Sequence, residues 1–121
     1  MTSYRIQRIN KQLQREIALL LEFRIKNEMV KSAIITGVEC SRDLQQAYVY
    51  FTTVSEENRN AVLKELQHLA GPLRSIMGKN LHLRQIPELH FRLDTSEDYG
   101  RHIDQLLDRI SEQLTEEEHE D

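Results

Sequence analysis

The sequence predicts an α+β domain in which helices cover one face of a three-stranded sheet. Two observations favour this class. Apolar residues recur every three or four positions in segments 4–23, 55–81 and 95–114. Segments 33–41 and 46–53 are rich in β-branched and aromatic residues, and side chains alternate between two faces in 46–53 and 88–94. The 121 residues contain neither a linker nor an internal repeat, which indicates one domain of ordinary size. The expected order of elements is α-β-β-α-kink-α-β-α.

The first segment predicts an amphipathic helix with a basic outer face. Ser3 is a suitable N-cap residue for it. The apolar positions fall within one arc of the helix: Ile6, Ile9, Leu13, Ile17, Leu20 and Leu21. The opposite arc carries the basic residues Arg5, Arg8, Lys11 and Arg15.

Segments 33–41 and 46–53 predict an antiparallel β-hairpin. Both are rich in β-branched and aromatic residues, and the short polar segment 42–44 is expected to form the turn. Side chains of a strand alternate between its two faces, so the second strand has one face for the core and one that stays at least partly open. The two sets are Ala47, Val49 and Phe51, and Tyr48, Tyr50 and Thr52.

The next segment predicts a helical region interrupted at Gly71-Pro72. Ser55 is the expected N-cap, with Glu56 and Glu57 in the first turn. Because proline removes a backbone donor but suits the first position of a helix, we expect either two helices or one sharply kinked helix, with a structural kink at Ala70, Gly71 and Pro72. Gly71 is expected to hold a backbone conformation that is poorly open to other residues. The apolar stripe is Val62, Leu63, Leu66, Leu69, Ala70, Leu73, Ile76, Met77 and Leu81.

The remaining chain predicts a third strand over 88–94 and a last helix from Thr95 or Ser96. Thr95 and Asp98 have the spacing of a capping box. The helix would bury Tyr99, Ile103, Leu106, Leu107, Ile110 and Leu114, while the sheet would bury Val38, Val49, Phe51 and Leu89 or Phe91. After Thr115 the run EEEHED has no apolar period, so we expect a domain over 1–115 and a disordered acidic tail over 116–121.

The charges of the chain are segregated, although the formal net charge is only −4. Residues 1–93 contain 14 Lys and Arg against 9 Asp and Glu, whereas residues 94–121 contain 2 against 11. A basic body indicates a polyanionic partner, and a merely solvated surface is the alternative.

No motif predicts catalysis, a metal site or a cofactor site. The chain lacks metalloprotease, phosphate-loop and hydrolase motifs, and its five histidines are scattered. Asp98 and His102 are one helical turn apart, which more often means a surface pair than a catalytic one. The single Cys40 lies in the apolar phase of its strand, so we expect a small core residue rather than a nucleophile. Without a possible internal disulfide, membrane span or signal peptide, we expect a cytoplasmic protein.

The strongest functional signal is a basic stretch between Arg74 and Arg92. Its cations are Arg74, Lys79, Arg84 and Arg92, with His82 and His90 between them and Glu88 as the one acid. A helix that begins at Pro72 would add free N–H groups near Arg74, which suits phosphate contacts. The alternative is a chance run of solvated cations. Tyr48 and Tyr50 on the open sheet face, beside His90 and Arg92, could stack bases. This signal is weaker, since tyrosines on a strand more often cover a sheet.

Three stretches of the sequence resemble the bacterial ribosome-binding factor A family. They are the opening RINKQLQREIALLL, the hairpin VECSRDLQQAYVYFT and the segment AGPLRSIMGKNLHLRQIPELHFRLDTS. The similarity runs from about residue 5 to residue 114. It implies a KH-like fold of the second type, in which an Ala-x-Gly kink replaces the GxxG loop. The matching positions here are Leu69, Ala70 and Gly71, so a leucine stands where the family has a small residue.

The resemblance also implies a function. Members bind the free small (30S) ribosomal subunit late in its assembly, promote maturation of 16S rRNA including processing of its 5′ end, and support growth in the cold. For this chain we expect a non-catalytic monomer without cofactors that holds rRNA through Arg74, Lys79, Arg84, Arg92, Arg5, Arg8, Lys11 and Arg15. A sequence-specific single-stranded RNA binder and a protein–protein interaction module remain alternatives.

Overall fold

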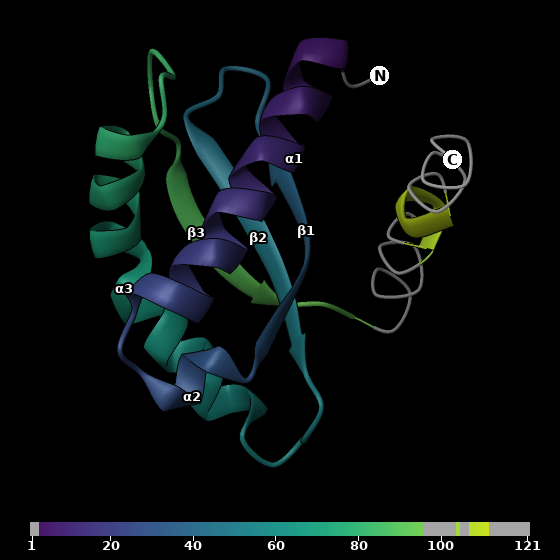
Figure 1. Cartoon of the computed structure of the whole chain (residues 1–121), viewed down its shortest axis with the longest axis vertical. Coiled ribbons are helices and arrows are strands. Elements are labelled where there is room, and N and C mark those ends of the chain that lie inside the picture. The colour runs from purple at the N-terminus through teal and green to yellow at the C-terminus, as the bar shows by residue number, and fades with distance from the viewer. Residues whose placement is uncertain (1–2, 96–103, 105–106, 112–121) are drawn as a thin grey trace, which may run out of the picture.

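The fold is described from a computed structural model of the chain, covering residues 3–95, 104 and 107–111. Within these residues the order of elements is α1 (Tyr4–Leu19), η1 (Leu20–Arg24), α2 (Glu28–Lys31), β1 (Ala33–Cys40), β2 (Gln46–Thr53), α3 (Arg59–Asn80) and β3 (Glu88–Leu93). Figure 1 shows α1 crossing in front of the sheet and α3 running along the side of the sheet where β3 lies. The expected α+β fold with one three-stranded sheet is confirmed.

The sheet has the order β1-β2-β3. The predicted hairpin is present, because β1 and β2 pair antiparallel from Ala33↔Thr53 to Cys40↔Ala47. β3 pairs with β2 in parallel, from Gln46↔Glu88 to Phe51↔Leu93, and α3 forms the crossover between them. β1 and β3 are therefore the two edges of the sheet.

The hairpin turn between β1 and β2 is held by side-chain hydrogen bonds. The Ser41 hydroxyl and the Gln45 N–H both donate to Oδ1 of Asp43, at 2.6 and 3.1 Å. These bonds lower the pKa of Asp43 because they stabilise its ionised form, and the bond from Ser41 has the larger effect. Leu44 follows with φ 59°, a left-handed conformation that a leucine rarely adopts.

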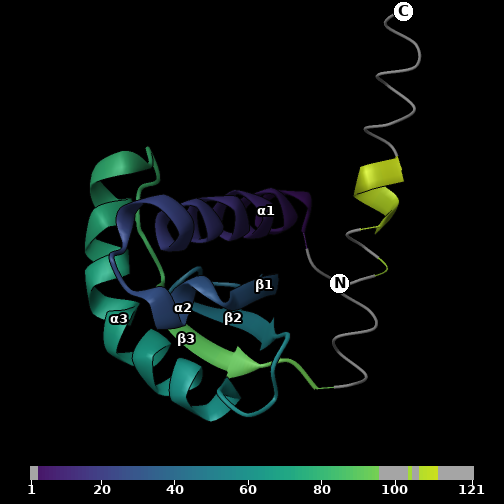
Figure 2. The ribbon, with the colours of Figure 1, turned by 60° about the horizontal axis from the view of Figure 1, so that its bottom comes forward.

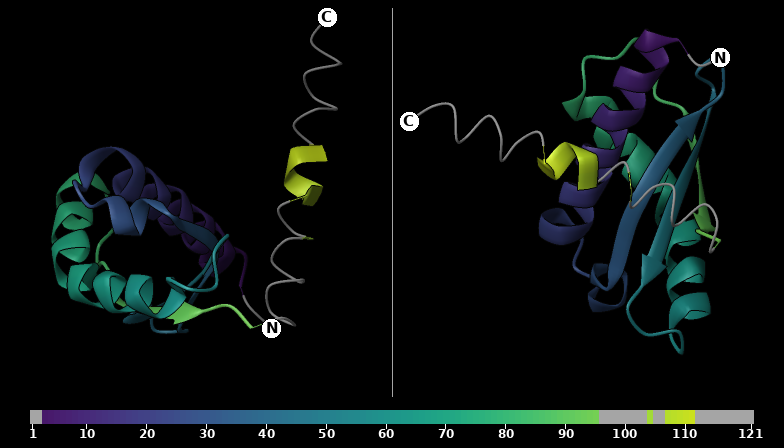
Figure 3. Two further views of the ribbon diagram at one scale, coloured as in Figure 1. Left: turned by 90° about the horizontal axis from the view of Figure 1, so that it is seen from below. Right: turned by 90° about the vertical axis from the view of Figure 1, so that its right-hand side faces the viewer.

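One core lies between the sheet and the helices, and Figure 3 shows α1 lying along one face of the strands. The alternation predicted for β2 is observed, since Ala47, Val49 and Phe51 are buried while Tyr48 and Tyr50 are only partly covered. The buried face also takes the following residues from the other elements: Ile9, Leu13, Ile17, Leu20, Leu21, Val30, Val38, Val62, Leu66, Leu73, Met77, Leu89 and Phe91. Both Leu89 and Phe91 are buried, which settles the choice left open for β3.

The end of α1 and the start of β1 were not anticipated from the sequence. η1 is a wider π-helical turn, closed by Ile25 N–H donating to the Leu20 carbonyl at 2.9 Å. It lets the adjacent leucines 20 and 21 both reach the core. The short helix α2 follows, with Asn27 as its N-cap accepting the Met29 N–H at 3.0 Å.

The predicted start of the central helix is wrong. α3 begins at Arg59 rather than after Ser55, and its N-cap residue is Asn58, which makes no side-chain cap bond. Segment 54–58 is a turn instead, because the Thr53 hydroxyl donates to the Ser55 carbonyl at 2.6 Å. Arg59 tightens this turn through a 2.8 Å bond from its guanidinium to the Thr53 carbonyl.

Two arrangements were expected at Gly71-Pro72, and one of them is observed. α3 continues through Pro72 as one helix of 22 residues, so the alternative of a single bent helix is the one observed. Figure 2 shows α3 curving along its length, as a proline that displaces the carbonyl of the preceding turn requires. Gly71 does not have a positive φ, and a Cβ there would meet no atom within 4 Å beyond its two chain neighbours and its own helix backbone. It is therefore not a strained position, and no new helix N-terminus exists at Pro72.

The last predicted helix lies mostly outside the described residues, as do its capping box, the Asp98–His102 pair and the acidic tail. Residues 104 and 107–111 are helical. Leu107 and Ile110 were expected to be buried, but they are 56% and 43% exposed. The predicted stripe therefore does not join the core at these two positions, which are drawn in yellow in Figure 1.

Candidate nucleic-acid interface

The basic arc predicted on α1 is exposed as expected. Its four cations lie opposite the buried residues Ile9, Leu13 and Ile17, and the arc comprises Arg5, Arg8, Lys11 and Arg15. The guanidinium carbon of Arg8 is 5.9 Å from the centre of the Tyr4 ring. Among the described residues, the ion pairs are Lys31–Glu28 and Arg59–Glu56, so no described carboxylate neutralises this arc.

Arg74 and Lys79 extend the basic surface onto the second half of α3. Both are exposed, and Lys79 lies in the last turn, where a cation is favoured by the helix dipole. Nε of Arg74 donates to the Ile86 carbonyl at 3.1 Å, which ties the helix to the loop 81–87. Arg84 is exposed in that same loop.

The two basic segments meet where α3 ends against α1. Nδ2 of Asn80 donates to Oε1 of Glu16 at 3.5 Å. Asn80 follows Lys79 in the chain, and Glu16 follows Arg15, so the contact brings the end of the α1 arc to the end of α3. Nothing in the sequence indicated this proximity, because 64 residues separate the partners.

Arg92 does not belong to the same surface. In β3 it alternates with the buried Leu89 and Phe91, so it projects from the open face of the sheet, opposite the helices. The basic stretch that is continuous in the sequence is therefore divided between two faces of the molecule. Its guanidinium carbon lies 4.2 Å from the centre of the Tyr48 ring.

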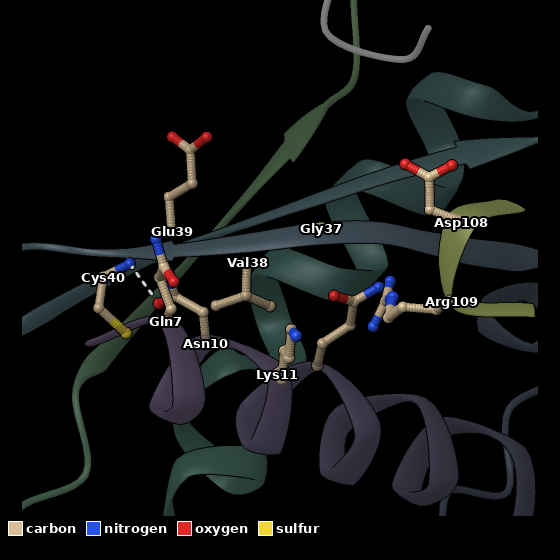
Figure 4. Close-up of a pocket in the computed structure, with 10 residues that line it drawn as sticks. Gln7, Asn10, Lys11, Gly37, Val38, Glu39, Cys40, Asp108 and Arg109 are labelled. Carbon is tan, nitrogen blue, oxygen red and sulfur yellow. Dashed lines mark hydrogen bonds between the residues drawn. The ribbon is translucent and has the colours of Figure 1, made fainter. Parts of the chain in front are cut away.

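A groove between α1 and the edge strand β1 was missed by the sequence reasoning. Its volume is about 600 Å³, and it is lined by Gln7, Asn10, Lys11, Gln14, Gly37, Val38, Glu39, Cys40, Asp108 and Arg109. Figure 4 shows polar side chains of α1 and residues 108 and 109 around it. The signal was present in the helical spacing of the amides at 7, 10 and 14, between the basic arc and the apolar stripe.

Cys40 lies at the end of this groove and is half-buried against the core. Oδ1 of Asn10 accepts its backbone N–H at 2.9 Å, the dashed line in Figure 4. Burial raises the pKa of the thiol to about 11, so the group is protonated at neutral pH. Its chemistry is that of a packing residue, as expected from the sequence.

Other chemistry has little support in the part of the chain that the structure describes. No group of three or more His, Cys, Asp or Glu residues there could hold a metal ion. None of the described helices is long and apolar enough to cross a membrane. The arrangement offers exposed cations on two helices and a planar cation on the open sheet face, both suited to a polyanion.

Known proteins share both the sequence and the fold. The sequence profile described as ribosome-binding factor A matches residues 5–107. Ribosome-binding factor A of Pseudomonas putida F1 is 42% identical over 108 residues, which cover 87% of this chain and 82% of the relative. The Desulforamulus reducens protein of that name is 38% identical over 119 residues, 98% and 99% of the two chains.

Two solved structures show the same architecture. The crystal structure of ribosome-binding factor A from Thermus thermophilus superimposes with a TM-score of 0.65 at 20% identity, covering 73% of this chain and 93% of the other. The solution structure of a putative ribosome binding factor A from Thermotoga maritima gives 0.64 at 26% identity, covering 79% and 92%. The expected KH-like fold is confirmed. With its sequence matched over residues 5–107 and its architecture shared, this chain belongs to the ribosome-binding factor A family.

Proposed function

We propose that this protein binds the free small (30S) ribosomal subunit and promotes late maturation of 16S rRNA, including processing of its 5′ end. Membership of the ribosome-binding factor A family supports a role in ribosome assembly. A homology model of the Thermus thermophilus member, fitted into a cryo-electron-microscopy map of its complex with the 30S subunit, has the same fold as this chain, with a TM-score of 0.57.

The observation that carries the proposal is the basic surface on the two helices. The cations of α1 and of the second half of α3 are exposed and have no ion-pair partner among the described residues. Cations spaced along a ridge release counterions when they meet phosphates, which provides affinity without reading sequence. A structured rRNA surface suits such a rigid array better than a flexible single strand.

The same residues support a role without catalysis. A protein that only binds can still direct assembly, if it has a higher affinity for one rRNA conformation than for another. On this proposal the factor stabilises a late conformation of the subunit and separate nucleases process the 5′ end. Residues 1–115 would bind as a monomer in the cytoplasm, without a cofactor, and the acidic residues 116–121 would make no contact with rRNA.

Gradient co-sedimentation tests the proposal. Purified protein is incubated with free small subunits, complete ribosomes or naked 16S rRNA, and its position in the gradient is measured. We expect co-sedimentation with small subunits at moderate salt, less with complete ribosomes, and loss of binding as salt rises. If the protein stays in the fractions that contain no subunits at every salt concentration, subunit binding is refuted.

A processing assay tests the second half of the proposal. Cells that lack the protein should accumulate 16S rRNA with an unprocessed 5′ end, measured by primer extension, and the effect should be larger in the cold. Precursor rRNA incubated with purified protein alone should stay uncut. Cleavage by the purified protein that disappears on Asp98→Ala or His102→Ala would contradict the non-catalytic role.

A further inference from the structure

A row of planar side chains crosses the open face of the sheet. Tyr48 on β2 is paired in register with His90 on β3, and Arg92 is the next residue on the same face of β3. The Tyr48 and His90 rings stack with centroids 5.4 Å apart and planes 28° apart. The guanidinium carbon of Arg92 lies 4.2 Å from the centre of the Tyr48 ring.

The row is fixed at one end and open at the other. Nε2 of His90 and Oε1 of Gln46 form a short hydrogen bond, which sets the orientation of the imidazole. The Arg92 side chain is exposed and makes no ion pair with a described carboxylate. Tyr48 therefore restricts the guanidinium without using its hydrogen-bonding N–H groups, and this reduces the entropy lost when a ligand binds.

The chemistry of the face favours a base over a phosphate. Glu88, two residues before His90, is exposed on this face. Carboxylates repel phosphates, so this face lacks the uninterrupted cations found on the helices. A nucleobase is neutral and planar, and it stacks on aromatic rings and on guanidinium groups.

We propose that Tyr48, His90 and Arg92 form a stacking site for an unpaired base of single-stranded RNA. The inference rests on the proposed function for its ligand, since rRNA is the partner proposed there. It adds a second site with another role: the helices contact phosphates of folded rRNA, and the open sheet face holds a base that is not paired.

A pair of matched oligonucleotides tests the site. One is a short single-stranded RNA with a central 2-aminopurine, and the other is the same RNA with an abasic position in its place. Both carry the same phosphates, so the difference in their affinities measures the base alone. For the parent protein we expect the base to improve affinity by about 5- to 150-fold and its fluorescence to be quenched on binding.

The variants separate stacking from charge. Arg92→Ala and Tyr48→Leu should remove the preference for the base, while Tyr48→Phe should keep it. Arg92→Lys should lower the preference but leave the salt dependence unchanged, because lysine keeps the charge and loses the plane. Arg74→Ala/Lys79→Ala/Arg84→Ala should keep the preference. Circular dichroism confirms that each variant is folded.

The outcomes are distinct from those for the proposed function. If Arg92→Lys matches the parent, Arg92 contacts only phosphate and the inference is wrong. It is equally wrong if the two oligonucleotides bind alike, or if neither binds. Small-subunit binding is measured on the same preparations. If the parent protein does not bind small subunits, the proposed function is refuted. If it binds them but shows no preference for the RNA that carries the base, only the stacking site is refuted.

Discussion

Replacing Arg74, Lys79 and Arg84 together with alanine should weaken binding to rRNA and flatten its dependence on salt. All three side chains are exposed, and none is paired with a described carboxylate. Among the described residues, the one side-chain hydrogen bond that the change removes is the 3.1 Å bond from Arg74 to the Ile86 carbonyl. An exposed hydrogen bond contributes about 1 kcal/mol, so the variant should remain folded.

The expected magnitude follows from counterion release. Each phosphate contact contributes about 0.9 to the slope of log affinity against log salt for a duplex, and about 0.7 for a single strand. Three lost contacts should therefore lower the slope by about 2 to 3 units. Between about 50 and 200 mM salt, the affinity advantage of the parent over the variant should shrink by about 20- to 40-fold.

The assay is fluorescence anisotropy with a labelled, folded rRNA fragment at several salt concentrations. The matched control is Arg24→Ala/Lys26→Ala/Lys64→Ala, which removes the same charge from exposed residues at the end of η1, just before α2 and in the first half of α3. Both triple variants lose three positive charges, but the control loses them outside the proposed rRNA surface. We therefore expect the control to keep the salt dependence of the parent. If the test variant is folded and retains the parent's affinity and slope, the α3 cations do not contact rRNA. The rRNA site would then lie on the α1 arc or on the face of Tyr48 and Tyr50.

Three other perturbations test the structure. Gly78→Ala should raise the free energy of unfolding by about 0.5–1 kcal/mol in urea titration, because Gly78 is exposed within α3 and a Cβ there would meet Cγ1 of Ile86 at an ordinary contact distance of 3.9 Å; a loss of stability would show that the site has no room for a side chain. Leu13→Ala should cost about 2–5 kcal/mol, since Leu13 is fully buried, and equal effects from the exposed control Gln12→Ala would refute the described core. The pKa of Cys40 is raised from 9.0 to about 11, so alkylation by iodoacetamide should keep accelerating between pH 9 and 11 in folded protein but level off in unfolded protein. Because the folded protein holds the thiol proton more tightly than the unfolded chain, the thiol's contribution to the free energy of unfolding is complete below pH 9 and is lost as pH rises toward 11. Cys40→Ala should lack this loss of stability, and identical alkaline unfolding curves for the two proteins would contradict the prediction.

The local sequence determined the elements that depend on periodicity. The alternation in 46–53 predicted which side of β2 is buried, because side chains of a strand must alternate between two faces. The three- and four-residue spacing in α1 likewise placed Ile9, Leu13 and Ile17 in the core and the basic arc in solvent. These patterns are local, and turning such a strand or helix over would expose its apolar side chains to water, so distant contacts rarely change which face is buried.

Helix-breaking and helix-capping residues were weaker predictors, because tertiary contacts can outweigh their local preferences. Pro72 indicated a break, yet α3 continues through it, with Leu73 and Met77 buried in the same core as Val62 and Leu66. Packing along both halves of the helix offsets the bond that proline removes. At the start of α3, the bonds among Thr53, Ser55 and Arg59 replace the predicted cap.

The arrangement of the candidate sites came only from the tertiary structure. Alternation in 88–94 already predicted that Arg92 and His90 share the open face of the sheet. Only the parallel pairing of β3 with β2 fixes the register that sets Arg92 against the Tyr48 ring. The contact between Asn80 and Glu16 joins the α3 cations to those of α1. Neither result can be predicted from spacing along the chain, because pairing of β3 with β2 and docking of α3 against α1 bring together residues that are far apart in the sequence.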